Sequence, residues 1–176
     1  SINAQGTVNV LESVRKICPK AAFLLCSTNK VYGENVDKIP LRKGVSRYHF
    51  NGIKGVSETF PIDLTGHTPY GVSKVAADLY TQEYGYRYGM KTAVFRMSCI
   101  YGTRQFGFED QGWVAHFAIR SVLKEPLTIY GDGKQVRDVL YVSDLVKAYE
   151  RFIEKGRTPQ VYNIGGGPCQ TTSLLE

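Results

Sequence analysis

The chain has 176 residues, 43% of them hydrophobic and 22% charged, and a formal net charge of +6. This balance is typical of one globular domain with a core of its own. The longest apolar run, residues 21–26, is far shorter than the roughly 20 residues of a membrane-spanning helix. The basic residues never form a run of three, which argues against a nucleic-acid-binding stripe and fits either an anionic small ligand or a generally basic surface.

The four cysteines lack the spacing of a metal site or of a Cys-x-x-Cys pair. They are Cys18, Cys26, Cys99 and Cys169. We therefore expect reduced thiols, a cytoplasmic location and no bound metal. The first residues are typical of an amphipathic helix and not of a signal peptide.

The first half of the sequence predicts two helices and a strand. Apolar residues at helical spacing predict a helix over 2–17. The continuous apolar run over 21–27 predicts a parallel strand that is covered on both faces. Residues 32–69 contain three prolines and are too long for a plain connection, so we expect a functional loop with short local elements. Proline in a first turn predicts that the next helix runs from Pro69 to about Tyr88.

The second half predicts further alternation of strands and helices. Strands are expected over 92–96, 127–130, 136–142 and 161–164, and helices over 112–124 and 143–155. The turn Gly131-Asp132-Gly133 is of the hairpin type, and Ser143 is the expected N-cap of the helix that it begins. Thr171 or Thr172 is expected to cap a last helix. Alternating elements of this kind indicate an α/β fold with a parallel sheet.

Residue types that suit proton transfer at a sugar hydroxyl follow one another in suitable elements. Tyr70 and Lys74 lie one turn apart, where residues i and i+4 share a helix face. A lysine ammonium there favours the phenolate of the tyrosine, which can take and return a carbinol proton. Thr28 lies at the carboxyl end of a predicted strand, where ligands bind in open α/β sheets. The plainer alternatives are a surface tyrosine and a threonine that caps a turn. A second Tyr-x-x-x-Lys, Tyr130 and Lys134, spans the Gly-Asp-Gly turn and cannot hold a helical geometry.

Four motifs occur in the order and at the spacing of one enzyme family. They are Thr-Asn-Lys-Val-Tyr-Gly at 28–33, Pro-Tyr-Gly-Val-Ser-Lys at 69–74, Phe-Arg-Met-Ser-Cys-Ile-Tyr-Gly-Thr-Arg-Gln at 95–105 and Gly-Asp-Gly-Lys-Gln-Val-Arg-Asp at 131–138. With these motifs the chain resembles the extended short-chain dehydrogenase/reductases of the NAD-dependent epimerase/dehydratase type. It looks most like the CDP-paratose (CDP-tyvelose) 2-epimerases.

The resemblance implies an α/β fold: a partial Rossmann-type parallel sheet with helices on both faces, and part of a small substrate-binding region. Residues 1–176 would form a single partial domain, with substrate-binding segments 97–142 and 161–176 interleaved with the core. The family's Gly-x-x-Gly-x-x-Gly pyrophosphate loop has no counterpart, since Gly165-Gly166-Gly167 follows a late strand and lacks that spacing. We therefore expect a fragment that lacks the N-terminal dinucleotide-binding half, is inactive and does not retain NAD by itself.

The resemblance also assigns roles to the motif residues. It implies the catalytic residues Thr28, Tyr70 and Lys74, and a NAD site to which Tyr70, Lys74, Met97 and Ser98 contribute. The implied substrate-binding residues are Asn29, Cys99, Arg104, Gln105, Tyr130 and Arg137. The two arginines fall where the family binds the nucleotide-sugar diphosphate, which suits guanidinium groups; surface solvation is the plainer alternative. Tyr130 either faces the nucleobase or packs under the turn.

Two departures from the family pattern narrow the reaction. Asn29 and Lys30 stand where the 4,6-dehydratases have Asp-Glu, so elimination of water is not expected, and Cys99 replaces the usual asparagine. The resemblance favours a CDP-sugar 2-epimerase; the alternatives are a UDP-hexose 4-epimerase and a non-catalytic fragment. The expected partners are a nucleotide sugar and further copies of the chain, associated through the open edge of strand 21–27 unless loop 34–68 covers it. Neither nucleic acid nor a membrane is expected.

Overall fold

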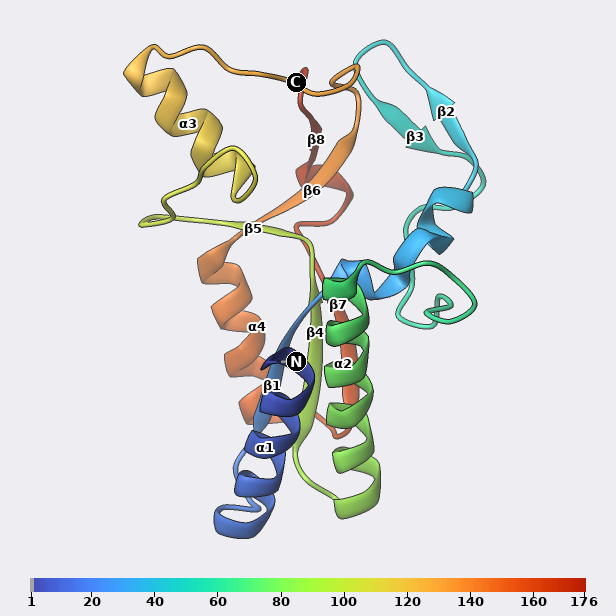
Figure 1. Cartoon of the computed structure of the whole chain (residues 1–176), viewed down its shortest axis with the longest axis vertical. Helices are drawn as coiled ribbons and strands as arrows, with labels where there is room; N and C mark the ends of the chain where they lie inside the picture. Colours follow the sequence, from blue (N-terminus) through green and yellow to red (C-terminus); the bar gives the residue numbers. More distant parts are fainter. Residues whose placement is uncertain (1) are drawn as a thin grey trace. The chain divides into compact units, whose positions relative to one another are not determined.

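The computed structural model describes residues 2–176, which divide into two units that interleave along the sequence (Figure 1). The first unit contains the chain up to Ile39, then Ile53–Met97 and Ala148–Ile164. The second unit contains Pro40–Gly52, Ser98–Lys147 and Gly165–Glu176. None of the helices in the described residues is both long enough and apolar enough to cross a membrane.

The first unit is built on a three-stranded parallel sheet in the order β1 (Phe23–Thr28), β4 (Thr92–Met97) and β7 (Gln160–Ile164). Helices α1 (Ile2–Ile17) and α2 (Pro69–Tyr88) cover one face, and α4 (Val142–Lys155) covers the other with its C-terminal part (Figure 1). The predicted α/β class with a parallel sheet is confirmed.

The alternation of side chains along the strands explains the two covered faces. Leu25 and Val94 pack with Ala77 of α2 on one face of the sheet. Phe95, one position further along β4, points to the opposite face and packs against Phe152 of α4. Because successive strand residues point to opposite faces, strands that are apolar throughout must be covered on both sides.

Local capping interactions define both ends of helix α2. The side chain of Thr68 accepts a hydrogen bond from the backbone N–H of Gly71 at 3.1 Å, and Pro69 occupies the first helical position. Gly89 ends the helix with a left-handed backbone, φ 63°. A Cβ atom on Gly85 would lie 2.4 Å from the Oγ1 atom of Thr92, so the helix and β4 approach closely there. The predicted bounds of this helix are confirmed.

The second unit contains a three-stranded sheet and a small hairpin. The sheet has the order β5 (Cys99–Tyr101), β6 (Val136–Tyr141) and β8 (Thr171–Ser173). The hairpin pairs β2 (Leu41–Lys43) with β3 (Tyr48–Phe50), and α3 spans Trp113–Leu123. Two 3-10 segments complete the chain: η1 (Asn29–Lys38) in the first unit and η2 (Pro168–Gln170) in the second.

Three predictions about this part of the chain are wrong. Residues 127–130 form no strand, because β6 takes its backbone partners from β5 (parallel) and β8 (antiparallel), so no hairpin forms around the Gly-Asp-Gly turn. Strand β6 runs directly into α4 at Val142, so Ser143 lies inside the helix and is not its N-cap. Thr171 and Thr172 lie in β8 and cap no helix, since they pair with Asp138 and Arg137.

Candidate active site

Thr28 is the last residue of β1, and η1 begins directly after it. Its Oγ1 atom accepts a hydrogen bond from the backbone N–H of Lys30 at 3.3 Å and lies 3.4 Å from the Oδ1 atom of Asn29. The capping role that the sequence left open is therefore present. A hydroxyl oxygen has two acceptor sites, so the cap leaves one site for a further donor, and the side chain is only half-buried.

Tyr70 and Lys74 lie in the first two turns of α2, against the same end of β1. The Nζ atom of Lys74 donates to the backbone carbonyl of Cys26 at 2.8 Å. A Cβ atom on Gly71 would lie 3.3 Å from the carbonyl oxygen of Lys30, so the first turn of α2 rests on the backbone just after β1. Tyr70 is 50% exposed and open to a ligand. The three residues with an expected catalytic role thus come from adjoining elements of one unit.

Met97 and Asn29 belong to the same end of the first unit's sheet. Met97 ends β4 and lies in register with Thr28. Its sulfur accepts a hydrogen bond from the phenol of Tyr149 at 3.5 Å. Burial of Tyr149 and its contact with the thiol of Cys26 raise the pKa of that phenol, which stays protonated. Asn29 is exposed beside the strand end.

The remaining predicted residues belong to the second unit. The Oγ atom of Ser98 is buried without a hydrogen-bond partner in the described part of the chain, as is the Oε1 atom of Gln105. The other amide atom of Gln105, Nε2, donates to the carbonyl of Ile100 at 3.3 Å, which holds this side chain inside its own loop. Cys99 begins β5 in register with Val139.

The predicted phosphate and base ligands are at the surface of that unit. Arg104 is exposed and has a left-handed backbone, φ 66°. Arg137 is exposed, and its Nη1 atom donates to the carbonyl of Val136 at 3.2 Å. Tyr130 is 66% exposed and hydrogen-bonded to Glu109, and that bond raises the pKa of its phenol. Tyr130 therefore does not pack under the turn, and its ring is accessible.

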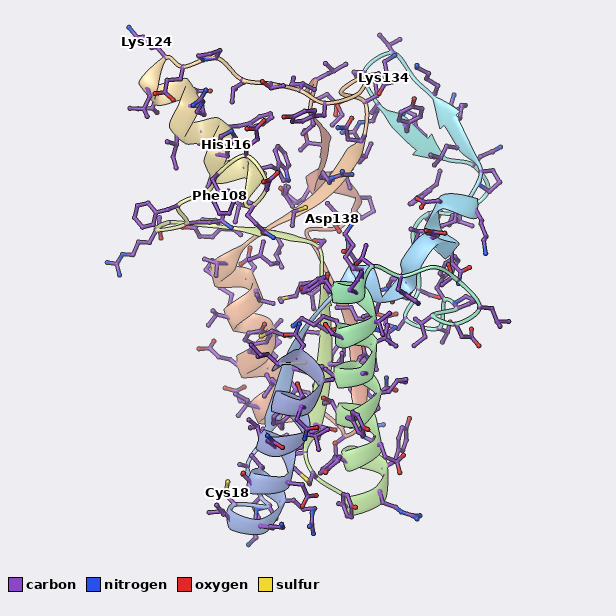
Figure 2. The ribbon with its side chains drawn as sticks, in the orientation of Figure 1. Cys18, Phe108, His116, Lys124, Lys134 and Asp138 are labelled. Atoms are coloured by element: carbon purple, nitrogen blue, oxygen red, sulfur yellow. The ribbon has the colours of Figure 1, made fainter. Side chains whose placement is uncertain are left out.

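The backbone of the glycine cluster 165–167 contacts a carboxylate of this same chain. The carboxylate of Asp138, which Figure 2 labels, accepts from the backbone N–H of Gly166 at 2.7 Å. A Cβ atom on Gly165 would lie 1.9 Å from this carboxylate. Burial raises the pKa of Asp138, and the amides of Gly166 and Gly167 oppose that rise. The cluster is thus filled from within, which supports its rejection as a pyrophosphate cradle. Within the first unit, the ammonium of Lys74 and the half-exposed phenol of Tyr70 are polar groups of the kind that a NAD ribose needs.

One buried group next to the site has no counterpart in the sequence predictions. Arg96 of β4 and Asp78 of α2 form an ion pair, with Nε to Oδ2 at 2.8 Å and side-chain exposures of 4% and 0%. A signal was available: Arg96 follows four apolar or small residues of a buried strand, and charged groups in such places are paired.

A model of the NAD dependent epimerase/dehydratase family matches residues 1–165. The chain belongs to this family. Among curated relatives, it is 40% identical to the CDP-paratose 2-epimerase of Salmonella typhi and 32% identical to a putative UDP-glucose 4-epimerase of Methanocaldococcus jannaschii. Each alignment covers 99% of this chain, but 53% and 50% of the relatives. The chain therefore spans about half the length of the curated relatives that it matches.

Solved structures support the same family membership. The chain superposes on the dTDP-glucose 4,6-dehydratase of Bacillus anthracis in complex with NAD, with a TM-score of 0.76 and 30% identity. It superposes on the UDP-glucose 4-epimerase of Thermus thermophilus in complex with NAD, with a TM-score of 0.74 and 29% identity. The two alignments cover 98% of this chain and 48% and 50% of those proteins.

Proposed function

We propose that this chain is the catalytic part of an NAD-dependent nucleotide-sugar epimerase, of the type that inverts C2 of a CDP-linked sugar. The observation that carries the proposal is the meeting of Thr28, Tyr70 and Lys74 at one end of the first unit's sheet. The similarity of the chain to the CDP-paratose 2-epimerase of Salmonella typhi supports the choice of the CDP-linked sugar and of its C2 atom.

Each of the three residues has a distinct part in the reaction. The phenolate of Tyr70 takes the proton of the sugar hydroxyl and later returns it to the re-formed alkoxide. The ammonium of Lys74 stabilises that phenolate, and the hydroxyl of Thr28 hydrogen-bonds the substrate oxygen. NAD, when bound, supplies the hydride acceptor and donor for the carbon atom. Between the two proton transfers the keto-sugar turns over, so that reduction occurs on its other face.

The residues after Thr28 argue against a dehydratase. Elimination of water needs an acid and a base beside the sugar, and Asn29 and Lys30 supply neither a carboxylic acid nor a carboxylate. Inversion at C4 of a UDP-hexose needs no acid or base beyond the three residues above, with NAD again as the hydride carrier. Similarity to the putative UDP-glucose 4-epimerase of Methanocaldococcus jannaschii and to the UDP-glucose 4-epimerase of Thermus thermophilus supports it as the alternative substrate choice. Arg104 and Arg137 are the proposed ligands of the substrate diphosphate in either case.

The test compares two tyrosines of α2 that are about equally exposed. Tyr70→Phe removes the proton acceptor, and we expect turnover of a CDP-3,6-dideoxyhexose by the protein of the complete reading frame to fall about 10²–10⁴-fold. Tyr80→Phe, at 47% exposure against 50% for Tyr70, is the matched control and should keep full activity. NMR of the product distinguishes inversion at C2 from inversion at C4. Wild-type turnover by Tyr70→Phe, or a 4-keto-6-deoxy product, would contradict the proposal.

We also propose that copies of the chain associate. In the described residues β1 pairs with β4 alone, so its other edge offers unpaired backbone groups to a second strand. Light scattering of this chain at high micromolar concentration should give at least the mass of a dimer, with the amides of Phe23–Thr28 that point away from β4 protected against exchange only in the associated form. A monodisperse monomer with these amides protected would show that the edge is covered from within the chain.

A further inference from the structure

A polar row crosses the first unit's sheet near the carboxyl ends of its strands. Ser27 of β1, Arg96 of β4 and Asn163 of β7 lie in register. Residues in register on parallel strands project to the same face of the sheet. Two positions earlier, Leu25 and Val94 form the apolar contact with α2 on this face. The polar row therefore replaces the apolar core at the level just before Thr28 and Met97.

Arg96 is the centre of this row, and its guanidinium makes four hydrogen bonds. The Nε and Nη2 atoms donate to the two carboxylate oxygens of Asp78 at 2.8 and 3.2 Å. The Nη1 atom donates to the phenol oxygen of Tyr32 at 3.1 Å and to the carbonyl of Glu58 at 3.0 Å. Burial opposes the charge of Arg96, but the bonds to Asp78 and Tyr32 outweigh it and raise its pKa. A charge at this depth persists because it is paired with a carboxylate and all three of its nitrogens donate hydrogen bonds.

Asp78 connects Arg96 to the helix that carries the proposed catalytic pair. Tyr70, Lys74 and Asp78 follow one another at four-residue steps in α2, so they share one face. Lys74 bonds the carbonyl of Cys26, and Asp78 accepts a hydrogen bond from the neighbouring hydroxyl of Ser27 at 3.4 Å. The ion pair with Arg96 is thus the anchor that fixes this face of the helix against the strand ends.

The other arm of Arg96 holds the segment 56–60. Tyr32, whose ring lies 5.1 Å from the guanidinium carbon, donates to the Oδ1 atom of Asn163 at 2.6 Å. Asn163 in turn bonds the segment twice: its backbone N–H donates to the carboxylate of Glu58 at 2.8 Å, and its amide donates to the carbonyl of Val56 at 2.9 Å. One continuous set of hydrogen bonds therefore runs from α2 to this segment, buried around Arg96 and more accessible towards Glu58.

We propose that Arg96 is a positioning residue for the reaction at Tyr70. Through Asp78 it holds α2, and through Tyr32 it holds the segment 56–60, so that one buried guanidinium fixes both relative to the carboxyl ends of the strands. The catalytic consequence rests on the proposed function, whereas the two mechanical links are contacts within this unit. A proton acceptor displaced by about 1 Å loses much of its effect, which is why such an anchor matters.

Arg96→Lys tests the link to α2, because it keeps the charge and loses the fork. In the protein of the complete reading frame we expect kcat to fall on the order of 10- to 100-fold, with KM for the CDP-sugar unchanged within about twofold. The acid limb of the pH–rate profile should move to higher pH, since a displaced Lys74 stabilises the phenolate less. Arg87→Lys, at an exposed position of the same helix, is the control that should behave as wild type.

Tyr32→Phe tests the link to the segment 56–60 and is the variant to use if Arg96→Lys does not fold. Loss of one buried hydroxyl should speed amide exchange across this segment about fivefold, while the exposed Tyr86→Phe leaves it unchanged. Exchange needs no turnover, so an active Tyr70→Phe enzyme would refute the proposed function and leave this link standing. Wild-type kcat and pH profile in a folded Arg96→Lys enzyme, or unchanged exchange in Tyr32→Phe, would overturn the inference.

Discussion

The two units differ in the kind of contact that stabilises each of them internally. Within residues 2–176, the buried apolar side chains all belong to the first unit except Leu145. The second unit instead joins its segments through charged contacts at the surface. Arg47 of the β2–β3 hairpin donates from Nε to Glu176 at 3.0 Å, and Lys43 pairs with Asp132 of the Gly-Asp-Gly turn at 3.0 Å.

This difference matches the chemistry proposed for each unit. Proton transfer needs atoms held to within a fraction of an ångström, and the first unit fixes its helix with a buried pair, Arg96 and Asp78. Binding of a diphosphate needs cations that can reach it, and bidentate guanidinium contacts form as the ligand arrives. Arg104 and Arg137 are exposed and suit that task. The comparison indicates that the residues proposed to hold other side chains in place are buried, whereas those proposed to bind the substrate diphosphate are exposed.

The largest expected effect breaks the core of the first unit. Phe95 is 1% exposed, and its ring lies 4.8 Å from that of Tyr149 and 5.3 Å from that of Tyr162. Phe95→Ala should lower the free energy of unfolding by about 3–5 kcal/mol, measured by urea denaturation. Phe106→Ala, in the second unit at 85% exposure, should change it by less than about 0.5 kcal/mol. Equal losses in the two variants would mean that the units are not built differently.

The elements with strong local signals were predictable from the sequence. Helix α2 carries its own start and stop signals in Thr68, Pro69 and Gly89, and β4 contains the apolar run Ala93-Val94-Phe95. Among the described residues, the strands that were not predicted have three residues each. β2 and β3 lie in the stretch expected to be a loop with short local elements, whereas β5 and β8 take their partners from β6, which is distant in sequence. Pairing of that kind is decided by tertiary contacts, and a three-residue window contains no periodicity to reveal it.

The site shows the same division. Thr28, Tyr70 and Lys74 could be proposed from the sequence because their order and spacing have a chemical meaning in themselves. Asp78 was not found, although it continues the four-residue series from Lys74, because an aspartate on a helix is ordinarily solvent-exposed. Its partner Arg96 comes from β4, and only the fold brings the two together. Residues that act through another residue leave little trace in a single sequence.

The smallest expected effect concerns how the hairpin is attached in the second unit. The backbone N–H of Tyr48 donates to the carbonyl of Lys134, which Figure 2 labels, at 3.1 Å, and the ammonium of Lys134 donates to Gly44 at 3.0 Å. Asp132 receives Lys43 and the phenol of Tyr48, and these bonds lower its pKa from 3.8 to about 2. Exchange of the Tyr48 amide therefore reports directly on this attachment.

The sign of the pH effect follows from that lowered pKa. Below about pH 5 the detached state takes up a proton on Asp132 that the attached state does not, so the stabilisation is complete above that pH and is lost as the pH falls towards 2. Glu12 of α1, which accepts a hydrogen bond from Tyr84 of α2, also has a pKa lowered to about 2, so acid alone does not distinguish the two units. Salt distinguishes the two units, because exposed ion pairs are screened by salt and the buried Arg96–Asp78 pair is screened much less. In 1 M NaCl at pH 7 we expect the intrinsic-rate-corrected exchange of the Tyr48 amide to rise a few-fold, with the amides of β4 unchanged. Asp132→Asn should remove most of this salt response, and salt that speeds exchange equally in β4 would show that the first unit is no more tightly held than the second.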